Sequence, residues 1–459
     1  MNYLLNPIFL GKVMKSYIFD VNRIWKLNQE ELNRFQEKKL REILYYSYKN
    51  VPFYNKKFKN ENIHPSEIKT INDFEKIPIT SKEELLKVPK SELRPINNNK
   101  LFTKTTTSGT KGEPLSIYIT LFDIVQGLLG YLRTFKEHDI NWRKDKIALI
   151  VDLRSESAER KYLNEGIFPS FKPFISFDNI QVFDFSKNAD KMIKNLNKFQ
   201  PDFIGGYVGK LVHLALLKGE GLGKNLNPRV VGSSGDPLAH YTRKLIEEAF
   251  DATVFDAYGA TESGPIAFEC KDKKFHLHSD LVYTEFFKDG GINNQETASN
   301  IVVTKLYGEG TPIIRYSGIN DIVLPSHEKC DCGCGGNLIK KIYGRDNWYL
   351  ILPGGKIMSP LSFSEIFSKV IYESKTRMIQ NIQIMQKEID EIEIRLIIDH
   401  NLAKIPIEEL FSMIKSSFEE KISPLSNIDI KIKEVKNFRQ KGYIISKINR
   451  KETDKKIYI

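Results

Sequence analysis

Val231-Gly232-Ser233-Ser234-Gly235-Asp236-Pro237-Leu238 is a stretch in which an apolar strand runs into a Gly-Ser turn and then toward a helical segment at 239–250. Further apolar runs of strand length lie at 146–153, 203–206, 229–232 and 253–256, and segments with helical periodicity separate them. Strands that alternate with helices favour an α/β sheet. Because ligands of open α/β sheets bind where the strands end, this turn is a candidate binding position.

A second strand-to-turn stretch follows: Phe255-Asp256-Ala257-Tyr258-Gly259-Ala260-Thr261-Glu262-Ser263-Gly264. Its Glu262 suits Mg²⁺, a hard cation that prefers oxygen ligands and bridges phosphates. Two structural alternatives stay open, in which Tyr258 is a packed ring and Glu262 is a carboxylate at the start of a helix.

The segment 103–114 concentrates hydroxyls and glycines, and it contains Thr107-Ser108-Gly109-Thr110-Lys111-Gly112. Glycines let a backbone turn closely around a polyphosphate, while hydroxyls, backbone N–H groups and Lys111 supply donors and positive charge. The spacing differs from Gly-x-x-x-x-Gly-Lys-Ser/Thr, which excludes a Walker P-loop. Taken alone, the segment fits an ordinary loop as well as a phosphate loop.

Four motifs occur in the chain in the order in which the adenylate-forming superfamily has them. They are Thr107-Ser108-Gly109-Thr110-Lys111-Gly112-Glu113-Pro114, Tyr258-Gly259-Ala260-Thr261-Glu262, Thr311-Pro312-Ile313-Ile314-Arg315-Tyr316 with Asp321, and Gly344-Arg345. The chain resembles the phenylacetate-CoA ligase branch of this superfamily, and more narrowly its CapK-like members, which are associated with capsular polysaccharide biosynthesis. The segments at 50–54, 77–82 and 443–447 also look like that branch, so the resemblance spans nearly the whole sequence. Each motif is weak alone, but four in order make chance agreement very improbable.

The resemblance implies an α/β fold class, with a large N-terminal AMP-binding domain of mixed sheets and helices and a small α+β C-terminal lid domain. It implies that ATP activates a carboxylic acid, giving an acyl-adenylate and pyrophosphate, before acyl transfer to CoA or to another thiol or amine. Polysaccharide biosynthesis is the pathway that the CapK-like members suggest. Attack on the α-phosphorus demands in-line positioning and charge neutralisation more than a protein nucleophile.

The resemblance also implies roles for residues of this chain. The phosphates of ATP would be held by the phosphate loop: Thr107, Ser108, Gly109, Thr110, Lys111 and Gly112. The adenine would be framed by the two strand ends: Ser234, Gly235, Asp236, Asp256, Ala257, Tyr258 and Gly259. Thr261 would contact the α-phosphate and Glu262 would hold Mg²⁺. Asp321 and Arg345 would engage the ribose hydroxyls.

The chain departs from the family pattern at the lysine that the C-terminal domain supplies for adenylation. In the CapK-like pattern this lysine stands three residues before Tyr443, where the chain has Gln440, and Lys441 follows. Glutamine cannot replace the positive charge, so we expect Lys441 to bridge the carboxylate and the ribose after a one-residue adjustment of the loop. A solvated tail lysine is the open alternative.

All four cysteines fall in one third of the chain and lie close to two histidines. Thiolates and imidazoles in two close-spaced groups suit tetrahedral zinc, and a cytosolic chain rarely uses such spacing for disulfides. We predict a structural Zn²⁺ on Cys270, His276, Cys330 and Cys332, with Cys334 and His278 as reserve ligands. Because Cys-x-Cys is not the commonest zinc spacing, ordinary thiols are the alternative.

The organisation of the sequence changes near Tyr343-Gly344-Arg345-Asp346, where a Gly-Pro-rich stretch leads into a remainder rich in Lys, Glu and Ile. We place residues 1–345 in the N-terminal domain, with a helical segment at about 1–100 and a zinc-binding insertion at about 265–340. Residues 346–459 form the mobile C-terminal domain, with strands expected at 388–398 and 428–435 around a helix at 406–421. Asp346 is the predicted hinge between adenylation and transfer.

The composition describes a globular chain and excludes several functions. The 459 residues suffice for one large and one smaller domain, and no run of about 18 apolar residues would span a membrane. The net charge of +11 is scattered except in the basic tail, and without a nucleic-acid motif we expect no nucleic-acid partner. Residues 1–20 do not resemble a secretion signal, so we predict a cytoplasmic protein. Peripheral contact of this segment with a membrane or partner, and a homodimer, are left open.

Two other functions stay open beside the acid-CoA-ligase-like enzyme. One is adenylyl transfer to a hydroxyl acceptor without CoA. The other is a weakly catalytic glycan-assembly or partner-binding protein with the same fold, which Gln440 permits. The phosphate loop, Glu262, Asp321 and Arg345 favour the enzyme, because phosphate chemistry requires them together. The acid is not readable from the sequence, although four residues are candidates for its binding site: Tyr131, Phe135, Gly206 and Tyr207.

Overall fold

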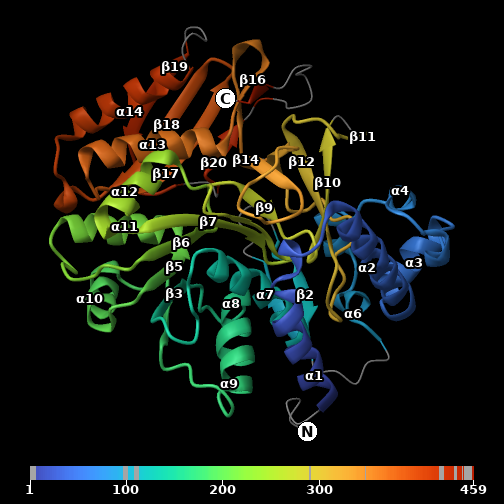
Figure 1. The fold of residues 1–459 in the computed structure, drawn as a ribbon. Helices are drawn as coiled ribbons and strands as arrows, with labels where there is room; N and C mark the ends of the chain where they lie inside the picture. Colours follow the sequence, from blue (N-terminus) through green and yellow to red (C-terminus); the bar gives the residue numbers. More distant parts are fainter. Residues whose placement is uncertain are drawn as a thin grey trace.

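A 12-stranded sheet forms the centre of the large domain, in the order β11-β10-β12-β13-β14-β9-β8-β7-β6-β5-β3-β4 (Figure 1). The computed structural model describes residues 7–96, 102–107, 113–288, 291–346, 348–422, 428–438, 442–446, 448 and 457–458. The parallel half of the sheet contains β3 (Ile147–Val151), β4 (Ile180–Asp184), β5 (Phe203–Tyr207), β6 (Val230–Ser234) and β7 (Thr253–Ala260). The strands predicted at 146–153, 203–206, 229–232 and 253–256 are therefore confirmed.

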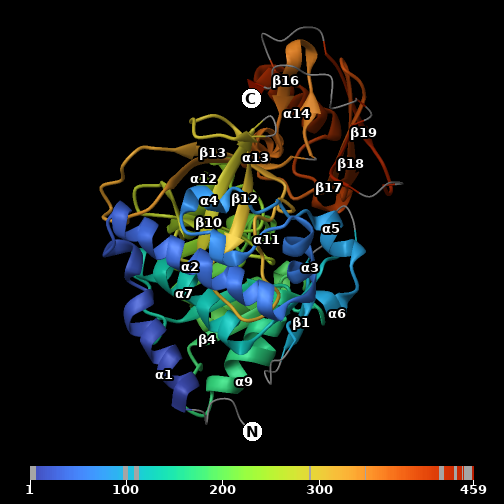
Figure 2. The same cartoon turned by 90° about the vertical axis from the view of Figure 1, so that its right-hand side faces the viewer.

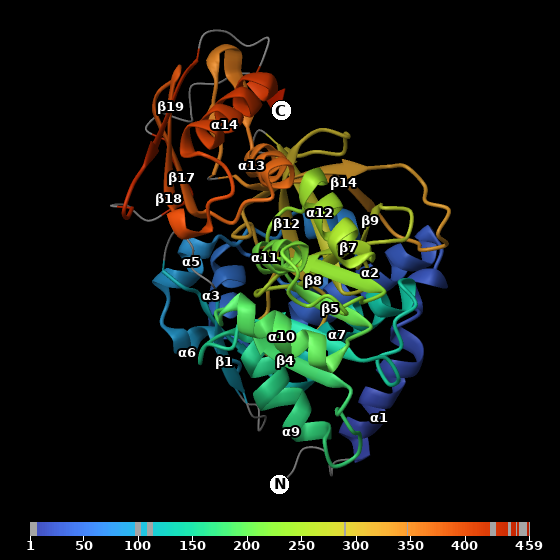
Figure 3. The same ribbon diagram turned by 90° about the vertical axis from the view of Figure 1, so that its left-hand side faces the viewer.

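Three helices cover one face of these parallel strands (Figure 3): α10 (Ala189–Phe199), α11 (Val208–Gly219) and α12 (His240–Phe250). Their apolar residues recur at steps of three and four, so that each helix buries one stripe. Leu196, Leu211 and Ile246 from this stripe share a core with Ile204 and Val231 of the strands. This packing fixes the carboxyl ends of β5, β6 and β7, where the predicted ligand-binding turns begin.

The remaining strands of the sheet pair antiparallel, which makes the sheet mixed. They are β8 (Gly264–Glu269), β9 (Phe275–Leu277), β10 (Val282–Lys288), β11 (Gly291–Ile292), β12 (Ser299–Lys305), β13 (Asp321–Ser326) and β14 (Leu338–Arg345). A separate two-stranded hairpin, β1 (Thr103–Thr106) with β2 (Ser116–Ile119), flanks the predicted phosphate loop. After it come α7 (Leu121–Glu137), α8 (Ala158–Arg160), a π-helix at Lys161–Ile167 and α9 (Phe168–Phe171). The α/β fold class with mixed sheets is confirmed.

Residues 7–96 form mainly helices that pack beside the antiparallel strands (Figure 2). They are α1 (Pro7–Lys15), a π-helix at Ser16–Asp20, a 3₁₀-helix at Arg23–Trp25, α2 (Gln29–Asn50), α3 (Pro52–Asn60), a 3₁₀-helix at Pro65–Glu67, α4 (Ile71–Phe74), α5 (Lys82–Lys87) and α6 (Lys90–Leu93). Helix α2 begins at a capping box of Asn28 and Glu31 and ends before Pro52, which opens α3.

A buried arginine fastens this helical segment to the sheet. The guanidinium of Arg315 donates to both carboxylate oxygens of Glu285 on β10, at 3.0 and 2.8 Å. Its remaining nitrogen donates to the carbonyl oxygens of Glu75 and Ile77. Tyr54 adds a second tie, because its hydroxyl donates to the carbonyl oxygen of Pro312 at 3.0 Å. The helical segment is therefore an integral part of the large domain.

The small domain has its own hydrophobic core, at the top of Figure 1. Its four-stranded sheet has the order β19-β18-β17-β20, with β17 (Ile379–Glu388), β18 (Glu391–Ile398), β19 (Asp429–Glu434) and β20 (Ile444–Ser446). Helices α13 (Pro360–Ser374) and α14 (Ile407–Ile422) pack with it, and β15 (Leu350–Ile351), β16 (Lys356–Met358) and β21 (Ile457–Tyr458) form a separate three-stranded sheet. Short 3₁₀-helices lie at Pro353–Gly355 and His400–Leu402. The two strands and the helix predicted in this region are found, and β17 is a strand that the sequence pattern missed.

Charged and aromatic pairs join the two domains along α11, α12 and α13. Glu220, just after α11, pairs with Arg377 at 2.7 Å and with Lys404 at 2.9 Å. Tyr372 on α13 donates a hydrogen bond of 2.7 Å to Glu248 on α12. These polar contacts hold the small domain against the large one, together with Ile371 and Tyr372 of α13, which pack against the apolar core of α10, α11 and α12.

Helix α1 lies at the end of the molecule opposite the small domain (Figure 1) and leaves apolar side chains exposed. The exposed fraction is 72% for Ile8 and 58% for Met14. No helix in the described part of the chain is long and apolar enough to cross a membrane. The peripheral contact expected of residues 1–20 stays a prediction, and residues 1–6 lie outside the described part.

Candidate active site

The motif residues of β6 and β7 meet at the carboxyl edge of the parallel strands. The strand register sets Tyr207 beside Ser234, and Ser234 beside Ala257. Gly235 follows with φ +90°, a conformation that favours glycine. A Cβ at Gly235 would lie 2.6 Å from the Tyr207 ring, so a side chain is excluded on steric grounds as well. Asp236 is exposed beyond this turn.

Asp256 lies buried under the two strand ends. The Ser233 hydroxyl donates to its carboxylate at 2.7 Å. Burial raises the pKa of Asp256 to about 7, although the Ser233 hydrogen bond opposes this. Its backbone N–H donates to Glu269 at 3.0 Å, and Glu269 accepts two hydrogen bonds of 2.8 Å from Arg243. A charged network below the sheet edge thus fixes the backbone predicted to frame the adenine.

Tyr258, Asp321 and Arg345 come together from three strands. The hydroxyl of Tyr258 donates to one carboxylate oxygen of Asp321 at 2.8 Å, and the Arg345 guanidinium lies 3.3 Å from the other. Asp321 opens β13 and Arg345 closes β14, and the two residues are direct cross-strand partners. Burial raises the pKa of Asp321, while Arg345 and Tyr258 lower it. The carboxylate is therefore held in one orientation, as ribose recognition requires.

Glu262 stands in the turn after β7, with Thr261 half-buried before it. The Tyr316 hydroxyl donates to the Glu262 carboxylate at 3.1 Å. Burial raises the pKa of Glu262, and the Tyr316 hydrogen bond, Arg345 and Lys82 oppose this shift. A buried carboxylate beside two cationic side chains is suited to a divalent cation and a polyphosphate.

The phosphate loop is described only at its edges. The backbone N–H of Thr107 donates to the carbonyl of Leu115 at 3.0 Å, and the backbone N–H of Leu115 donates to the Thr107 hydroxyl at 3.1 Å. These two hydrogen bonds join the chain segments that precede and follow the predicted loop. Its other predicted residues lie outside the described part of the chain: Ser108, Gly109, Thr110, Lys111 and Gly112. The same holds for Gln440 and Lys441.

The structure adds partners that the sequence pattern did not reveal. Ser233, Glu269 and Arg243 support Asp256, while Tyr316 and Lys82 stand near Glu262. Tyr316 and Lys82 belong to segments that carry the family resemblance, but the resemblance did not assign a role to either residue. Arg243 and Glu269 have no such signal. Phe135, a candidate for the acid site, instead packs in the core against Phe203, with 4.9 Å between ring centroids.

Cys270, His276, Cys330 and Cys332 form the predicted four-residue cluster, and their ligand atoms all lie within 4.8 Å of one another. The sulfur atoms of Cys270 and Cys330 are 3.7 Å apart, and the sulfur of Cys332 is 3.3 Å from Nε2 of His276. Tetrahedral zinc with ordinary Zn–S and Zn–N bonds would place its ligand atoms about 3.3 to 3.8 Å apart. The donor set and spacing therefore fit zinc. The four cysteines form no disulfide.

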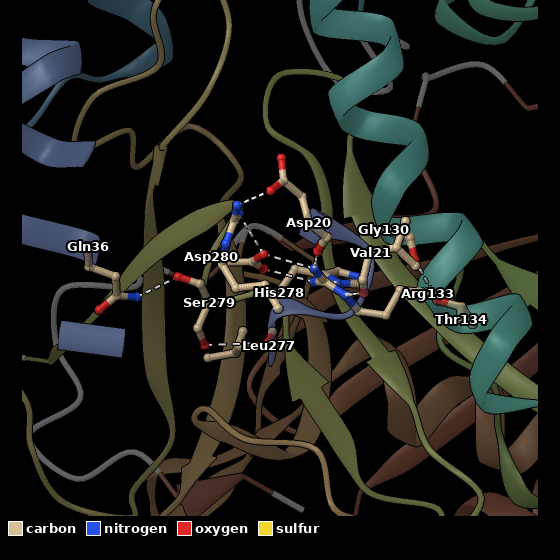
Figure 4. Close-up of polar contacts among 11 residues, drawn as sticks. Asp20, Val21, Gln36, Gly130, Arg133, Thr134, Leu277, His278, Ser279 and Asp280 are labelled. Atoms are coloured by element: carbon tan, nitrogen blue, oxygen red, sulfur yellow. Dashed lines mark hydrogen bonds and ion pairs between the residues drawn. The ribbon is translucent and has the colours of Figure 1, made fainter. Parts of the chain in front are cut away.

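The reserve ligands lie outside this cluster, and His278 belongs to a different network (Figure 4). The buried guanidinium of Arg133 lies 3.0 Å from Nδ1 of His278 and donates to both carboxylate oxygens of Asp280 at 2.9 Å. Because arginine is always a donor, His278 accepts at Nδ1 and is neutral. Arg133 also donates to the carbonyls of Asp20 and Val21, at 3.0 and 3.1 Å. This network anchors the chain where the π-helix Ser16–Asp20 ends.

Comparison with known proteins finds CapK and CoA ligases by sequence, and a CoA ligase among solved structures. Protein CapK of Staphylococcus aureus is 25% identical over 421 residues, which cover 88% of this chain and 90% of CapK. The phenylacetate-coenzyme A ligase of Escherichia coli (strain K12) is 26% identical over 303 residues, which cover 62% of this chain and 66% of that enzyme. No family model matches the chain.

Among solved structures, the fold is similar to that of 2-hydroxyisobutyryl-CoA ligase in the postadenylation state with an acyl-adenylate. The TM-score is 0.72 at 18% sequence identity, and the superposition covers 95% of this chain and 91% of that one. The chain therefore has the adenylate-forming ligase fold.

Proposed function

We propose, from the homology of this chain to CapK and the phenylacetate-coenzyme A ligases and from its adenylate-forming ligase fold, that the protein activates a carboxylic acid with ATP. The products would be an acyl-adenylate and pyrophosphate, and the acyl group would pass to CoA or to another thiol or amine. The observation that carries this proposal is the convergence of Tyr258, Asp321, Arg345 and Glu262 at one edge of the sheet.

The geometry supports a different role in ATP binding for each of these residues. Ser234, Gly235, Asp256 and Ala257 provide the backbone edge against which an adenine would lie, and Gly259 continues it. Asp321, held by Tyr258 and Arg345, offers an oriented carboxylate to the ribose hydroxyls. Bound Mg²⁺ would neutralise phosphate charge, and Glu262 supplies a carboxylate for it. Thr261 and the phosphate loop complete the proposed set.

Coenzyme A is the proposed acceptor because the curated relatives include CoA ligases. Involvement in polysaccharide biosynthesis is a narrower proposal, and it rests on the similarity to CapK alone. Adenylyl transfer to a hydroxyl acceptor is the second candidate. In that reaction a hydroxyl attacks the α-phosphorus and pyrophosphate leaves, so release would depend on the hydroxyl compound and not on a carboxylate or on CoA.

The proposal is tested by pyrophosphate release over a panel of aryl, fatty, amino and sugar-derived acids, each with and without CoA. We expect acid-dependent release with at least one class, and a thioester product when CoA is present. If no acid supports release, the binding-protein alternative replaces the enzyme. Acid-dependent release without a CoA thioester would point to another thiol or an amine as acceptor, whereas release that needs a hydroxyl compound and no carboxylate would favour the adenylyltransferase.

Lys441 is the proposed bridging cation of the small domain. We expect Lys441→Ala to lower acid-dependent ATP–pyrophosphate exchange by about 100-fold, since it removes a charge that acts only near the transition state. Lys436→Ala, which removes an exposed lysine on the same segment, is the matched control and should leave exchange unchanged. Unaltered exchange in Lys441→Ala would rule out this role.

The small domain is proposed to swing about Asp346 between the two half-reactions. The backbone N–H of Asp346 donates to the carbonyl of Asn320 at 2.6 Å, directly after β14. We expect Asp346→Pro, which restricts φ and removes this N–H, to slow thioester formation at least about 10-fold more than acyl-adenylate formation. Asp346→Ala keeps the N–H and serves as control. Equal loss of both half-reactions would count against the hinge.

A structural Zn²⁺ at the Cys270, His276, Cys330 and Cys332 cluster is also proposed. Burial lowers the pKa of His276 to about 4, so the imidazole is neutral and available as a ligand near neutral pH. The ion would join the β8–β9 turn to the loop before β14, two segments that otherwise meet through a few strand contacts. No residue of the cluster belongs to the proposed nucleotide site, which favours a structural role.

Metal analysis of purified protein is expected to give about one zinc per chain. Cys332→Ser should lose most of the metal, and a loss of about 2 kcal/mol would lower the Tm by roughly 2–3 °C in a domain of this size. Cys334→Ala is the matched control, because Cys334 is a neighbouring buried thiol outside the four-ligand cluster. Zinc well below one per chain in the unaltered protein would remove the proposal.

A further inference from the structure

The carboxyl edge of the sheet continues beyond the proposed nucleotide site, toward β5 and β3. Tyr207, the last residue of β5, stands in register beside Ser234, and Gly206 stands beside Ile150 of β3. Glu159 on α8 reaches this edge and accepts a hydrogen bond from the Tyr207 hydroxyl. A carboxylate and a phenol therefore stand directly beside the position proposed for ATP.

Few neighbouring groups stabilise the negative charge of the Glu159 carboxylate. Among the described residues, Tyr207 is its only side-chain hydrogen-bond partner, and it forms no ion pair. The nearby Arg154 guanidinium is engaged elsewhere, because its Nε lies 3.0 and 2.9 Å from the two carboxylate oxygens of Asp152. Burial raises the pKa of Glu159, and the Tyr207 hydrogen bond only partly opposes this. The site thus has acceptor capacity that the protein does not use.

Tyrosine hydroxyls continue this polar surface toward Glu262. Tyr131 is 44% exposed, and burial together with the nearby charge of Glu159 raises its pKa to about 12. The Tyr307 hydroxyl donates to the carbonyl of Ser263 at 3.4 Å, one residue after Glu262. Tyr162 lies near enough to both Glu159 and Glu262 to be influenced by their charges. Tyr131, Tyr162 and Tyr307 therefore lie in the neighbourhood of Glu159, Glu262 and Ser263.

We infer that the acid activated by this protein carries a hydrogen-bond donor, a hydroxyl or an ammonium group, at the end remote from its carboxylate, and that Glu159 and Tyr207 bind this group. The inference rests on the proposed function, since it places the acid between Glu159 and the α-phosphate. A phenyl ring or a plain alkyl chain would cover Glu159 without offering it a donor. A buried acceptor left unpaired disfavours such a ligand strongly.

Matched acids test the inference: 4-hydroxybutanoate and 4-aminobutanoate against butanoate, and 4-hydroxyphenylacetate against phenylacetate. We expect a kcat/KM for pyrophosphate release at least about 10-fold higher for the donor-bearing member of a pair. Comparing 4-hydroxybutanoate with 4-aminobutanoate shows whether the site prefers a hydroxyl or an ammonium donor. Equal or higher kcat/KM for the donor-free acids would overturn the inference and leave the proposed function intact.

Variants identify the residues that create the preference. Glu159→Gln, which removes the charge at constant shape, and Tyr207→Phe, which removes the phenol, should each lower the preference ratio at least about 5-fold. Because the readout is a ratio between two acids, a general loss of folding would not imitate it. Glu165→Gln is the control, since it weakens only ion pairs with Arg160 and Lys161 at a carboxylate that does not contact Glu159 or Tyr207, and it should leave the ratio unchanged.

An unchanged ratio in both Glu159→Gln and Tyr207→Phe would overturn the assignment of these residues. Absence of pyrophosphate release with every acid would instead overturn the proposed function itself, and the inference with it. The two failures are therefore distinguishable from one data set.

Discussion

Replacing Glu262 by glutamine is expected to lower kcat for acid-dependent pyrophosphate release by about 100- to 1000-fold. Glutamine keeps the shape of the side chain and can still accept the 3.1 Å hydrogen bond from Tyr316. It removes the negative charge that the proposed Mg²⁺ site requires. Initial rates at several Mg²⁺ concentrations measure the effect, and the loss should shrink only partly at high Mg²⁺.

Tyr316→Phe is the matched control for Glu262→Gln, because it removes the hydrogen bond and leaves the carboxylate. We expect a loss of less than about 10-fold for this variant. Burial raises the pKa of Glu262, so its carboxylate becomes protonated at a higher pH than that of an exposed glutamate. The apparent affinity for Mg²⁺ should therefore decrease as the pH is lowered. A Glu262→Gln enzyme with near-normal kcat would contradict the metal-binding role.

Replacing Arg133 by methionine is expected to destabilise the protein by about 3–5 kcal/mol, the largest stability effect that we predict. The Arg133 and Asp280 side chains are both 0% exposed, so the variant leaves a buried carboxylate whose remaining ion-pair partner is the partly exposed Arg23. It also removes the hydrogen bonds to the carbonyls of Asp20 and Val21 (Figure 4). Urea unfolding followed by circular dichroism measures the change in the free energy of unfolding.

Two variants separate the buried charge from lost packing. Arg23→Met removes only the outer cation of the network, whose side chain is 22% exposed and lies 3.3 Å from Asp280. It should cost about 1 kcal/mol or less. The double variant Arg133→Met with Asp280→Leu should recover part of the loss, because it removes both charges together. A double variant less stable than Arg133→Met alone would show that the charge is not the cause.

Local patterns in the sequence were sufficient to predict most of the fold. The parallel strands around Ser234 and Ala257 have apolar runs of the right length, and α12 has a clear helical period. β17 was missed because its exposed and buried residues do not alternate regularly. The ordered motifs also placed Tyr258, Asp321 and Arg345 in one site, where the strand register does bring them together.

Contacts between distant segments could not be predicted in this way. Glu159 and Tyr207 belong to different elements, and neither carries a motif. Arg133 and Asp280 lie 147 residues apart, and nothing local in either segment indicates that they pair. Such pairs depend on the tertiary arrangement alone. The four members of the Cys270, His276, Cys330 and Cys332 cluster were easier to predict, because cysteine and histidine are rare and clustered in the sequence.

The tie between Arg315 and the helical segment has a consequence for the synthesis of the protein. Arg315 donates to the carbonyl of Glu75, which precedes it by 240 residues. At about 5–20 residues per second, a ribosome needs about 12 to 48 s to add that stretch. During this interval Phe53 and Phe58, both buried in the finished protein, have not yet met the strands that cover them. Nascent chains of this protein should therefore depend on chaperones that shield apolar helices until the second half of the sheet has been made.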